Sequence, residues 1–201
     1  MDPMEPDKEV YISVDVESAG PHPARYSLLS IGACLALEPE EGFYVELQPD
    51  HAEMTPGAAR ISGLSLEKLT GEGSPPGDAM QSFADWIGRV TPQEAVPVCV
   101  AFNAPFDWMF INDYFHRYLG RNPFGHSALD IKAAYLGLAG VQWHETSLLH
   151  ISESLGLHIQ LSHNALQDAR DQAAVFRLLL AAIRRRDRQD PPPVMPPRSP
   201  A

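Results

Sequence analysis

"YISVDVESAGP", residues 11–21, places two carboxylates in a stretch that otherwise reads as a buried strand. Ile12, Val14 and Val16 are apolar, which predicts a strand over Tyr11–Val16 with one face in a hydrophobic core. Asp15 and Glu17 lie two residues apart, so both point to the other face of that strand. Because a buried carboxylate is costly without a compensating partner, the pair indicates that cations bind there.

The composition is that of a globular protein with one domain. The chain has 201 residues, 44% of them hydrophobic, which suits a single core. No apolar run approaches the roughly 20 residues of a membrane span, and the acidic, polar N-terminus does not resemble a signal peptide. We therefore expect a cytoplasmic protein with no membrane partner. Cys34 and Cys99 lie in apolar runs without metal-binding spacing, and we expect reduced core residues.

The net charge of −11 limits the kind of nucleic-acid binding that is open to this chain. A long polyanion is bound non-specifically through a basic surface, which this composition does not favour. A small site can still bind the last nucleotides of a strand through metal ions and stacking. Metal ligands would then account for part of the negative charge.

The remaining pattern predicts an α/β fold with a mixed sheet. Two β-rich runs, at 27–37 and 42–49, extend the first strand into an antiparallel meander, and a second buried strand is predicted over 95–102. The order of strands, helices, a strand and further helices is typical of α/β domains. Helical patterns are predicted at 55–69 with a turn at Gly63, and at 78–90, 103–119, 128–138, 146–157 and 165–186.

Several boundaries follow from local composition. The glycine- and proline-rich segment 71–77 predicts a loop. Asn103 is expected to cap the helix over 103–119, with Pro105 in its first turn. Residues 1–9 predict a flexible leader and residues 187–201 a disordered, proline-rich tail. The domain itself is therefore expected to span residues 10–186.

Four acidic residues occupy positions that can converge at one end of the sheet. Asp15 and Glu17 lie on the first strand, and Asp107 lies in the first turn of the helix that follows the strand at 95–102. Asp168 lies in the first turn of the last helix, five residues after His163 in a loop. Oxygen ligands of this kind suit magnesium or manganese. Two such ions about 3.5–4 Å apart stabilise phosphodiester hydrolysis, and a nearby imidazole is suited to deprotonate water near neutral pH.

These residues carry a resemblance to a known family. "VDVES" (14–18), "FNAPFDW" (102–108) and "HNALQDA" (163–169) resemble the three motifs of the DEDDh 3′→5′ exonucleases, a DnaQ-like family of the ribonuclease H-like superfamily. "RISGLS" (60–65) resembles the segment in which that family places apolar side chains against the terminal bases. The family includes the proofreading subunit of bacterial DNA polymerase III, ribonuclease T and oligoribonuclease. The resemblance covers about residues 10–182.

The resemblance implies a ribonuclease H-like mixed five-stranded sheet flanked by helices. It also implies a metal-dependent enzyme that releases nucleoside 5′-monophosphates from the 3′ end of single-stranded DNA or RNA. Two Mg²⁺ or Mn²⁺ ions would be ligated by Asp15, Glu17, Asp107 and Asp168, with His163 as the general base. The residues implied in substrate binding are Ser18, Ile61, Leu64 and Asn103. One difference bears on substrate preference, because the family often has His-Asn where this chain has Phe102-Asn103.

Two other functions are compatible with the fold. A nucleic-acid-binding module that has lost catalysis is disfavoured because all five catalytic positions are filled. Another ribonuclease H-like nuclease or strand-transfer enzyme is disfavoured by the His-x4-Asp and Phe-Asp patterns. Ile61 and Leu64 fit a core position as well as a wedge against bases. The sequence leaves open DNA against RNA, and whether the chain works alone, as a homodimer or with a polymerase.

Overall fold

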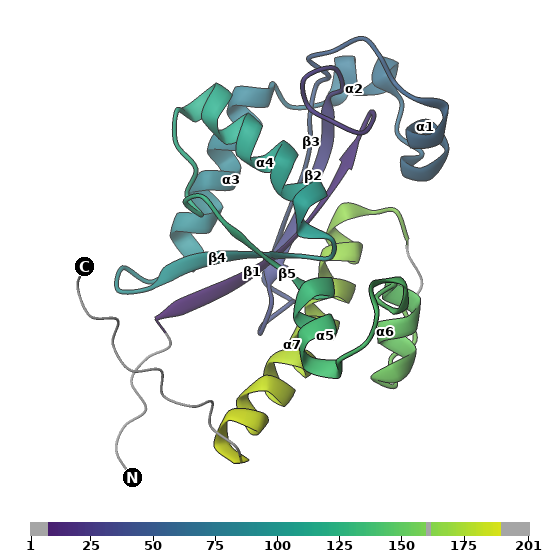
Figure 1. Ribbon diagram of the computed structural model, residues 1–201. Coiled ribbons are helices and arrows are strands. Elements are labelled where there is room, and N and C mark those ends of the chain that lie inside the picture. The colour runs from purple at the N-terminus through teal and green to yellow at the C-terminus, as the bar shows by residue number, and fades with distance from the viewer. Residues whose placement is uncertain (1–7, 160–161, 190–201) are drawn as a thin grey trace, which may run out of the picture.

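A mixed sheet of five strands, in the order β3-β2-β1-β4-β5, forms the middle of the molecule (Figure 1). The computed structural model describes residues 8–159 and 162–189, with the backbone alone for 187–189. Strand β1 pairs antiparallel with β2 and parallel with β4, so the meander and the parallel strands meet at β1. The α/β class and the mixed five-stranded sheet are confirmed. The strands are β1 (Glu9–Ser18), β2 (Leu28–Leu35), β3 (Gly42–Glu46), β4 (Val96–Ala101) and β5 (Ala128–Asp130).

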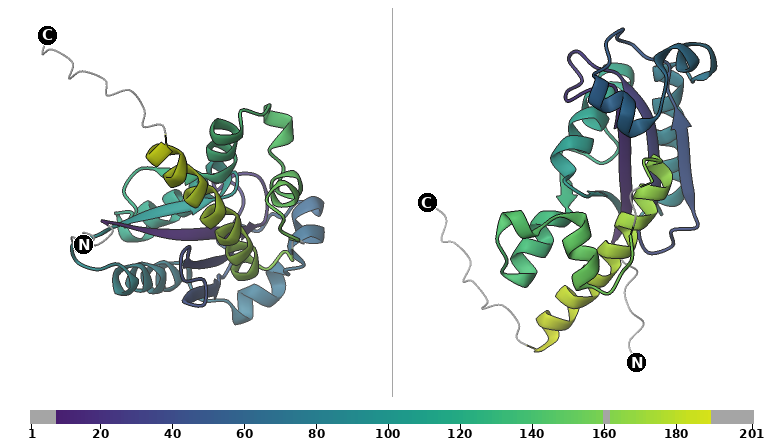
Figure 2. Two further views of the ribbon diagram at one scale, coloured as in Figure 1. Left: turned by 90° about the horizontal axis from the view of Figure 1, so that it is seen from below. Right: turned by 90° about the vertical axis from the view of Figure 1, so that its right-hand side faces the viewer.

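Helices cover both faces of the sheet and one of its ends. Helices α3 and α4 pack on one face, whereas α5, α6 and α7 pack on the other (Figures 1 and 2). Helices α1 and α2 lie near the carboxyl end of β1 (Figure 1). The bounds are α1 (Pro56–Ser62), α2 (Leu66–Glu72), α3 (Pro76–Val90), α4 (Ala104–Leu119), α5 (Ile131–Ala139), α6 (Leu148–Ser154) and α7 (Ala165–Gln189), with a 3₁₀ turn η1 (Trp143–Glu145) between α5 and α6.

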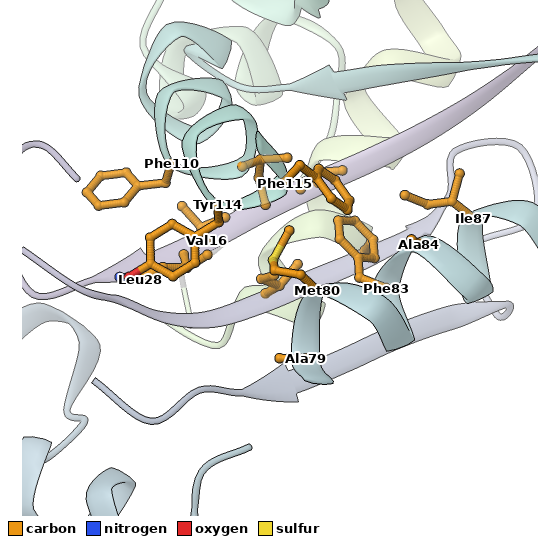
Figure 3. Close-up of a cluster of buried hydrophobic side chains, with 14 of the residues drawn as sticks. Val16, Leu28, Ala79, Met80, Phe83, Ala84, Ile87, Phe110, Tyr114 and Phe115 are labelled. Atoms are coloured by element: carbon orange, nitrogen blue, oxygen red, sulfur yellow. Dashed lines mark hydrogen bonds between the residues drawn. The ribbon is translucent and has the colours of Figure 1, made fainter. Parts of the chain in front are cut away.

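The alternation along β1 separates a hydrophobic core from the acidic pair. Val16 packs with Phe110 and other aromatic side chains in the layer between the sheet and helices α3 and α4 (Figure 3). Because side chains alternate along a strand, Asp15 and Glu17 face the other side, where α7 packs. The core therefore determines which face carries the two carboxylates.

The segment predicted as a helix over 128–138 begins instead as a strand. Residues Ala128–Asp130 form β5, in which Leu129 pairs with Val100 of β4. The helix starts only at Ile131, and the carboxylate of Asp130 caps it by accepting a hydrogen bond from Ala133 N at 2.8 Å. Local helical spacing could not show that three residues find hydrogen-bonding partners on a strand distant in sequence.

Asn103 occupies the position before α4, but its side chain does not cap the helix as expected. Its backbone is left-handed, with φ of 62°, and its carboxamide makes no capping hydrogen bond. The carbonyl of Asn103 instead accepts from Phe106 N at 3.0 Å. The tight left-handed turn between β4 and α4 takes the carboxamide away from the first-turn N–H groups.

Other boundaries move by a few residues. The loop predicted over 71–77 is shorter, because α2 runs to Glu72 and α3 begins at Pro76. Helix α7 continues to Gln189, so residues 187–189 are helical and not part of a tail; residues 190–201 lie outside the described part of the chain. Strand β1 already includes Glu9, and Lys8 is also described, whereas residues 1–7 of the predicted leader lie outside the described part of the chain.

Two simpler predictions hold in the described residues. Cys34 and Cys99 are free and buried. Gly63 ends α1 in the left-handed conformation, with φ of 65°, as the predicted turn requires. Within the described ranges, no helix combines the length and apolar character needed to cross a membrane.

Candidate active site

The acidic pair of β1 meets a buried amide from α7. Gln172 is only 3% exposed, and its Nε2 donates a hydrogen bond of 2.5 Å to Asp15 Oδ1. The same amide accepts from Phe102 N at 2.9 Å through Oε1. One side chain therefore joins α7 to the end of β4 and to the first carboxylate of the site.

Asp107 reaches the site from the opposite side of the sheet. Strand β4, the parallel partner of β1, ends before β1 does. The last β1–β4 pair is Ser13 with Val100, so the rest of β1 has no β4 residue beside it. The backbone N–H of Val16 donates instead to Asp107 Oδ1, at 3.1 Å. Asp107 is 4% exposed. The first turn of α4 thus replaces the missing strand and places a carboxylate beside Asp15.

Asp168 is brought close by an unusually near approach of α7 to the sheet. Gly32 of β2 lies opposite Asp15, and a Cβ atom at Gly32 would stand 2.0 Å from the backbone carbon of Ala165. Only glycine leaves room for the first turn of α7 at that distance. Asp168 Oδ1 is then held by both the N–H and the hydroxyl of Ser162, each at 2.9 Å.

His163 lies in the exposed turn that leads into α7. Its φ of 55° is left-handed, a conformation that histidine adopts more readily than most residues. One ligand atom each from Glu17, His163 and Asp168 lies within 4.8 Å of the others. All five residues expected to be catalytic therefore meet at the carboxyl end of β1.

The electrostatics of the site are those of crowded carboxylates. Burial raises the pKa of Asp15 well above its ordinary value, and the charges of Asp107, Asp168 and Glu17 raise it further. Burial, then the charge of Asp168, raises the pKa of Glu17 to about 7. Burial also raises the pKa of Asp107, although the hydrogen bond from Val16 N opposes that shift.

These residues fit a site for divalent cations. The ligand atoms are carboxylate oxygens, the donors that hard cations such as Mg²⁺ and Mn²⁺ prefer. Burial, and then the negative charge of neighbouring carboxylates, raises the pKa of Asp15 and of Glu17. A cation placed among them would remove that repulsion and keep the carboxylates ionised.

The residues expected to bind substrate surround this site with different exposure. Ser18 is buried, and its hydroxyl donates to the carbonyl of Gly20 at 2.8 Å. Ile61 is 51% exposed on α1, whereas Leu64 packs partly buried in a small cluster. That cluster includes Ala19, which follows β1 directly. Asn103 is exposed at the turn before α4. These four remain predictions as substrate contacts.

Sequence reasoning missed the residues that hold the carboxylates in place. Gln172 follows Asp168 by four residues, so helical spacing alone puts both on one face of α7. Ser162 and Asn164 flank His163; Asn164 Oδ1 accepts from Gln167 N at 3.1 Å and caps α7. An asparagine just before a predicted helix was the available signal for that cap.

Comparison with known proteins decides the family. The RNase_T family model, described as exonuclease, matches residues 12–176. A protein of Escherichia coli named 3′-5′ DNA exonuclease Cap18 is 49% identical over 176 residues, which are 88% of this chain and 94% of that protein. The chain belongs to this exonuclease family. It is a 3′–5′ exonuclease.

Solved structures show the same fold. The nuclease domain of 3′hExo, a DEDDh family member bound to rAMP, superposes on the exonuclease with a TM-score of 0.71 at 16% identity, covering 85% of this chain and 91% of that one. Escherichia coli exonuclease I with a dT13 oligonucleotide gives a TM-score of 0.68 at 20% identity, covering 88% of this chain but 42% of that longer one. The ribonuclease H-like architecture is thereby confirmed.

Proposed function

We propose that this exonuclease shortens single-stranded DNA from its 3′ end, with two Mg²⁺ or Mn²⁺ ions held by Asp15, Glu17, Asp107 and Asp168. The observation that carries the proposal is the convergence of these four carboxylates with His163 at the end of β1. The choice of DNA is supported by 49% identity to a protein named as a DNA exonuclease.

Each group of the chain has a distinct part in the proposed reaction. The bound cations would stabilise the negative charge that develops on the attacking and leaving oxygens. His163, exposed beside Glu17 and Asp168, takes a proton from the attacking water. Water forms the new bond to phosphorus while the bond from phosphorus to the 3′ oxygen of the preceding nucleotide breaks. A nucleoside 5′-monophosphate leaves, and the 3′ oxygen takes up a proton from solvent water to become the 3′ hydroxyl of the shortened strand.

The neighbours of the carboxylates fix their orientation for this chemistry. Gln172 holds Asp15 through one oxygen, and Ser162 holds Asp168 through one oxygen. The second oxygen of each carboxylate stays available to a cation. Holding ligands in advance lowers the entropic cost of assembling the site.

Matched oligonucleotides test this proposal. Single strands of DNA and RNA with one sequence, labelled at the 5′ end, are incubated with Mg²⁺ and with EDTA. We expect a ladder of shortening DNA products, a slower ladder on RNA and no products in EDTA. Internal cuts would indicate another ribonuclease H-like nuclease. Faster degradation of RNA would contradict the choice of DNA, and full activity in EDTA would contradict the cation site.

A further inference from the structure

Two aromatic side chains from separate parts of the chain lie beside one cation. Lys132 Nζ lies 4.3 Å from the ring centre of Trp143 and 5.8 Å from that of Phe102. Phe102 directly follows β4, Lys132 lies in the first turn of α5, and Trp143 begins η1. We call Phe102, Lys132 and Trp143 the aromatic platform.

The platform borders the carboxylate site. The N–H of Phe102 is bound by Gln172, the same amide that holds Asp15. Lys132 follows β5 by two residues, and β5 runs parallel to β4 at the same edge of the sheet. The carboxyl ends of parallel strands form the edge at which α/β proteins bind ligands. The platform and the acidic site therefore share one edge.

The exposure of Trp143 is not explained by packing. This side chain is 56% exposed. The turn that carries it is fixed by other groups: Glu145 accepts from Gln142 N at 2.9 Å, and the hydroxyl of Thr146 donates to the carbonyl of Trp143 at 2.7 Å. The fold therefore holds the backbone of Trp143 firmly while leaving much of its indole in water.

Lys132 supplies positive charge beside an acidic site. It has no ion-pair partner among the carboxylates in the described part of the chain. A single-stranded nucleic acid approaching a chain of net charge −11 needs such local cations. Exposed aromatic rings next to a cation are the combination that binds single strands, since a base stacks on the ring and a phosphate meets the charge.

We propose that Trp143 and Lys132 bind a nucleotide upstream of the cleaved bond, with its base stacked on Trp143 and a phosphate at Lys132. The inference rests on the proposed function and extends it to the path of the strand. Ile61 and Leu64 are expected to contact the terminal bases. They lie near the carboxyl end of β1, on the side of β2. The platform lies on the other side of β1, because Phe102 follows β4 and Lys132 follows β5. A single-stranded nucleic acid with its 3′ end against α1 would then run past the aromatic platform.

Substrates of two lengths separate this site from the catalytic one. The p-nitrophenyl ester of thymidine 5′-monophosphate presents only the terminal nucleotide, whereas (dT)₁₀ also reaches upstream contacts. We expect Trp143→Ala to raise KM for (dT)₁₀ by roughly 5- to 100-fold, the range that loss of one base stack produces. Its kcat, and both constants for the ester, should stay near those of wild type. Trp143→Phe should restore much of the affinity because a ring remains.

The lysine has its own readout. Lys132→Ala should reduce the slope of log KM against log salt for (dT)₁₀ by about 0.7, the value for one phosphate contact on a single strand. Matched controls are Leu149→Ala, which trims an exposed apolar side chain on α6, and Lys8→Ala, at the far end of β1. Neither should change KM or the salt slope.

Two results would overturn the platform while leaving the exonuclease intact. In the first, Trp143→Ala keeps wild-type KM for (dT)₁₀. In the second, KM for the ester rises as much as for (dT)₁₀, which assigns Trp143 to the terminal nucleotide. Failure of the proposed function looks different, because wild type would then hydrolyse neither substrate with Mg²⁺ present.

Discussion

Gln172 on α7 connects Asp15 of β1 with Phe102 at the end of β4. Its amide donates to Asp15 and accepts from Phe102 N while buried on α7. A buried polar group that loses its partner costs about 1–3 kcal/mol. The side chain thus links the stability of the fold to the orientation of a carboxylate.

Replacing Gln172 with leucine should therefore lower both stability and activity. Gln172→Leu leaves Phe102 N and Asp15 Oδ1 without partners, so we expect the free energy of unfolding to fall by about 1–3 kcal/mol. Urea unfolding measures this, with Gln167→Leu as the control. Gln167 is exposed on the same helix, where its side chain donates to Asp171 and its backbone N–H donates to Asn164. Equal stability of the two variants would show that the buried bridge contributes little.

Glu17 gives the exonuclease a pH dependence that cations should remove. Its pKa rises from 4.5 in the unfolded chain to about 7 in the fold. The folded state then binds the proton of Glu17 more tightly than the unfolded chain does. This proton binding stabilises the fold fully below pH 4.5, and the contribution is lost as pH rises toward 7. In EDTA, the melting temperature should fall between pH 5 and pH 8, and fall less in Glu17→Gln.

Magnesium supplies the matching control for Glu17. Cations bind the ionised carboxylates, so Mg²⁺ should raise the melting temperature more at pH 8 than at pH 5. Differential scanning calorimetry at both pH values measures this. An identical effect of Mg²⁺ at the two pH values, or a wild type and Glu17→Gln with the same pH profile, would contradict the assignment of Glu17.

Residue types and spacing indicated the chemical groups of the site but not the groups that hold them in place. The proximity of Asp15, Glu17, Asp107, His163 and Asp168 could be predicted because their types and spacing resemble the motifs of a family, whereas their catalytic roles stay predictions. The supporting groups are ordinary polar residues whose role depends on which elements touch. Trp143 and Lys132 lie 11 residues apart and meet only because η1 folds back on α5.

Among the elements, α7 has the most exacting position. Its first turn carries Asp168, the preceding turn carries His163, and its second turn carries Gln172. All three reach the site because Gly32 lets the backbone of Ala165 approach β2. The contact of one helix end with one strand thus sets the geometry of half the site.

Gly32→Ala should displace that helix end. Its Cβ would overlap backbone atoms of Ala165 and Leu166, which cannot move independently of the helix. We expect a loss of about 1–3 kcal/mol of stability, typical of overpacking, and lower exonuclease activity even with saturating Mg²⁺. Thermal unfolding and (dT)₁₀ hydrolysis measure the two effects.

Gly88 on α3 provides the control for this substitution. A Cβ there meets nothing within 4 Å, so Gly88→Ala should stabilise the exonuclease by about 0.5–1 kcal/mol through helix propensity, with unchanged activity. If Gly32→Ala behaved like Gly88→Ala, the close approach of α7 would not matter for the site.

The elements that sequence patterns missed share one physical cause. Strand β5 has three residues and exists through its pairing with β4. The turn at Asn103 depends on where α4 must start so that Asp107 reaches Val16 N. Periodicity predicts elements that bury a long face, such as α3 and α7. It cannot predict those that exist because of a distant partner.

The fold as a whole brings negatively charged side chains together at one edge of the sheet. Strand β1 contributes two carboxylates, and helices on opposite faces of the sheet contribute one each. Such crowding destabilises the protein on its own and becomes favourable with cations. Ile61 and Leu64 lie on one side of this edge and the aromatic platform on the other, so the 3′ end of a nucleic acid would bind between them.

We infer that carboxylates hold the cations while His163 moves the proton. The structure places His163 near enough to Glu17 and Asp168 to act as base or as ligand. The most direct test is the single-turnover rate of (dT)₁₀ hydrolysis by His163→Ala as Mn²⁺ is increased, with Asp168→Ala beside it. For His163→Ala we predict saturation at the wild-type Mn²⁺ concentration, with a maximal rate lowered by roughly 10²- to 10⁴-fold. Asp168→Ala should need far more Mn²⁺. Recovery of the wild-type rate in His163→Ala at high Mn²⁺ would show that His163 is a ligand, and would contradict the claim.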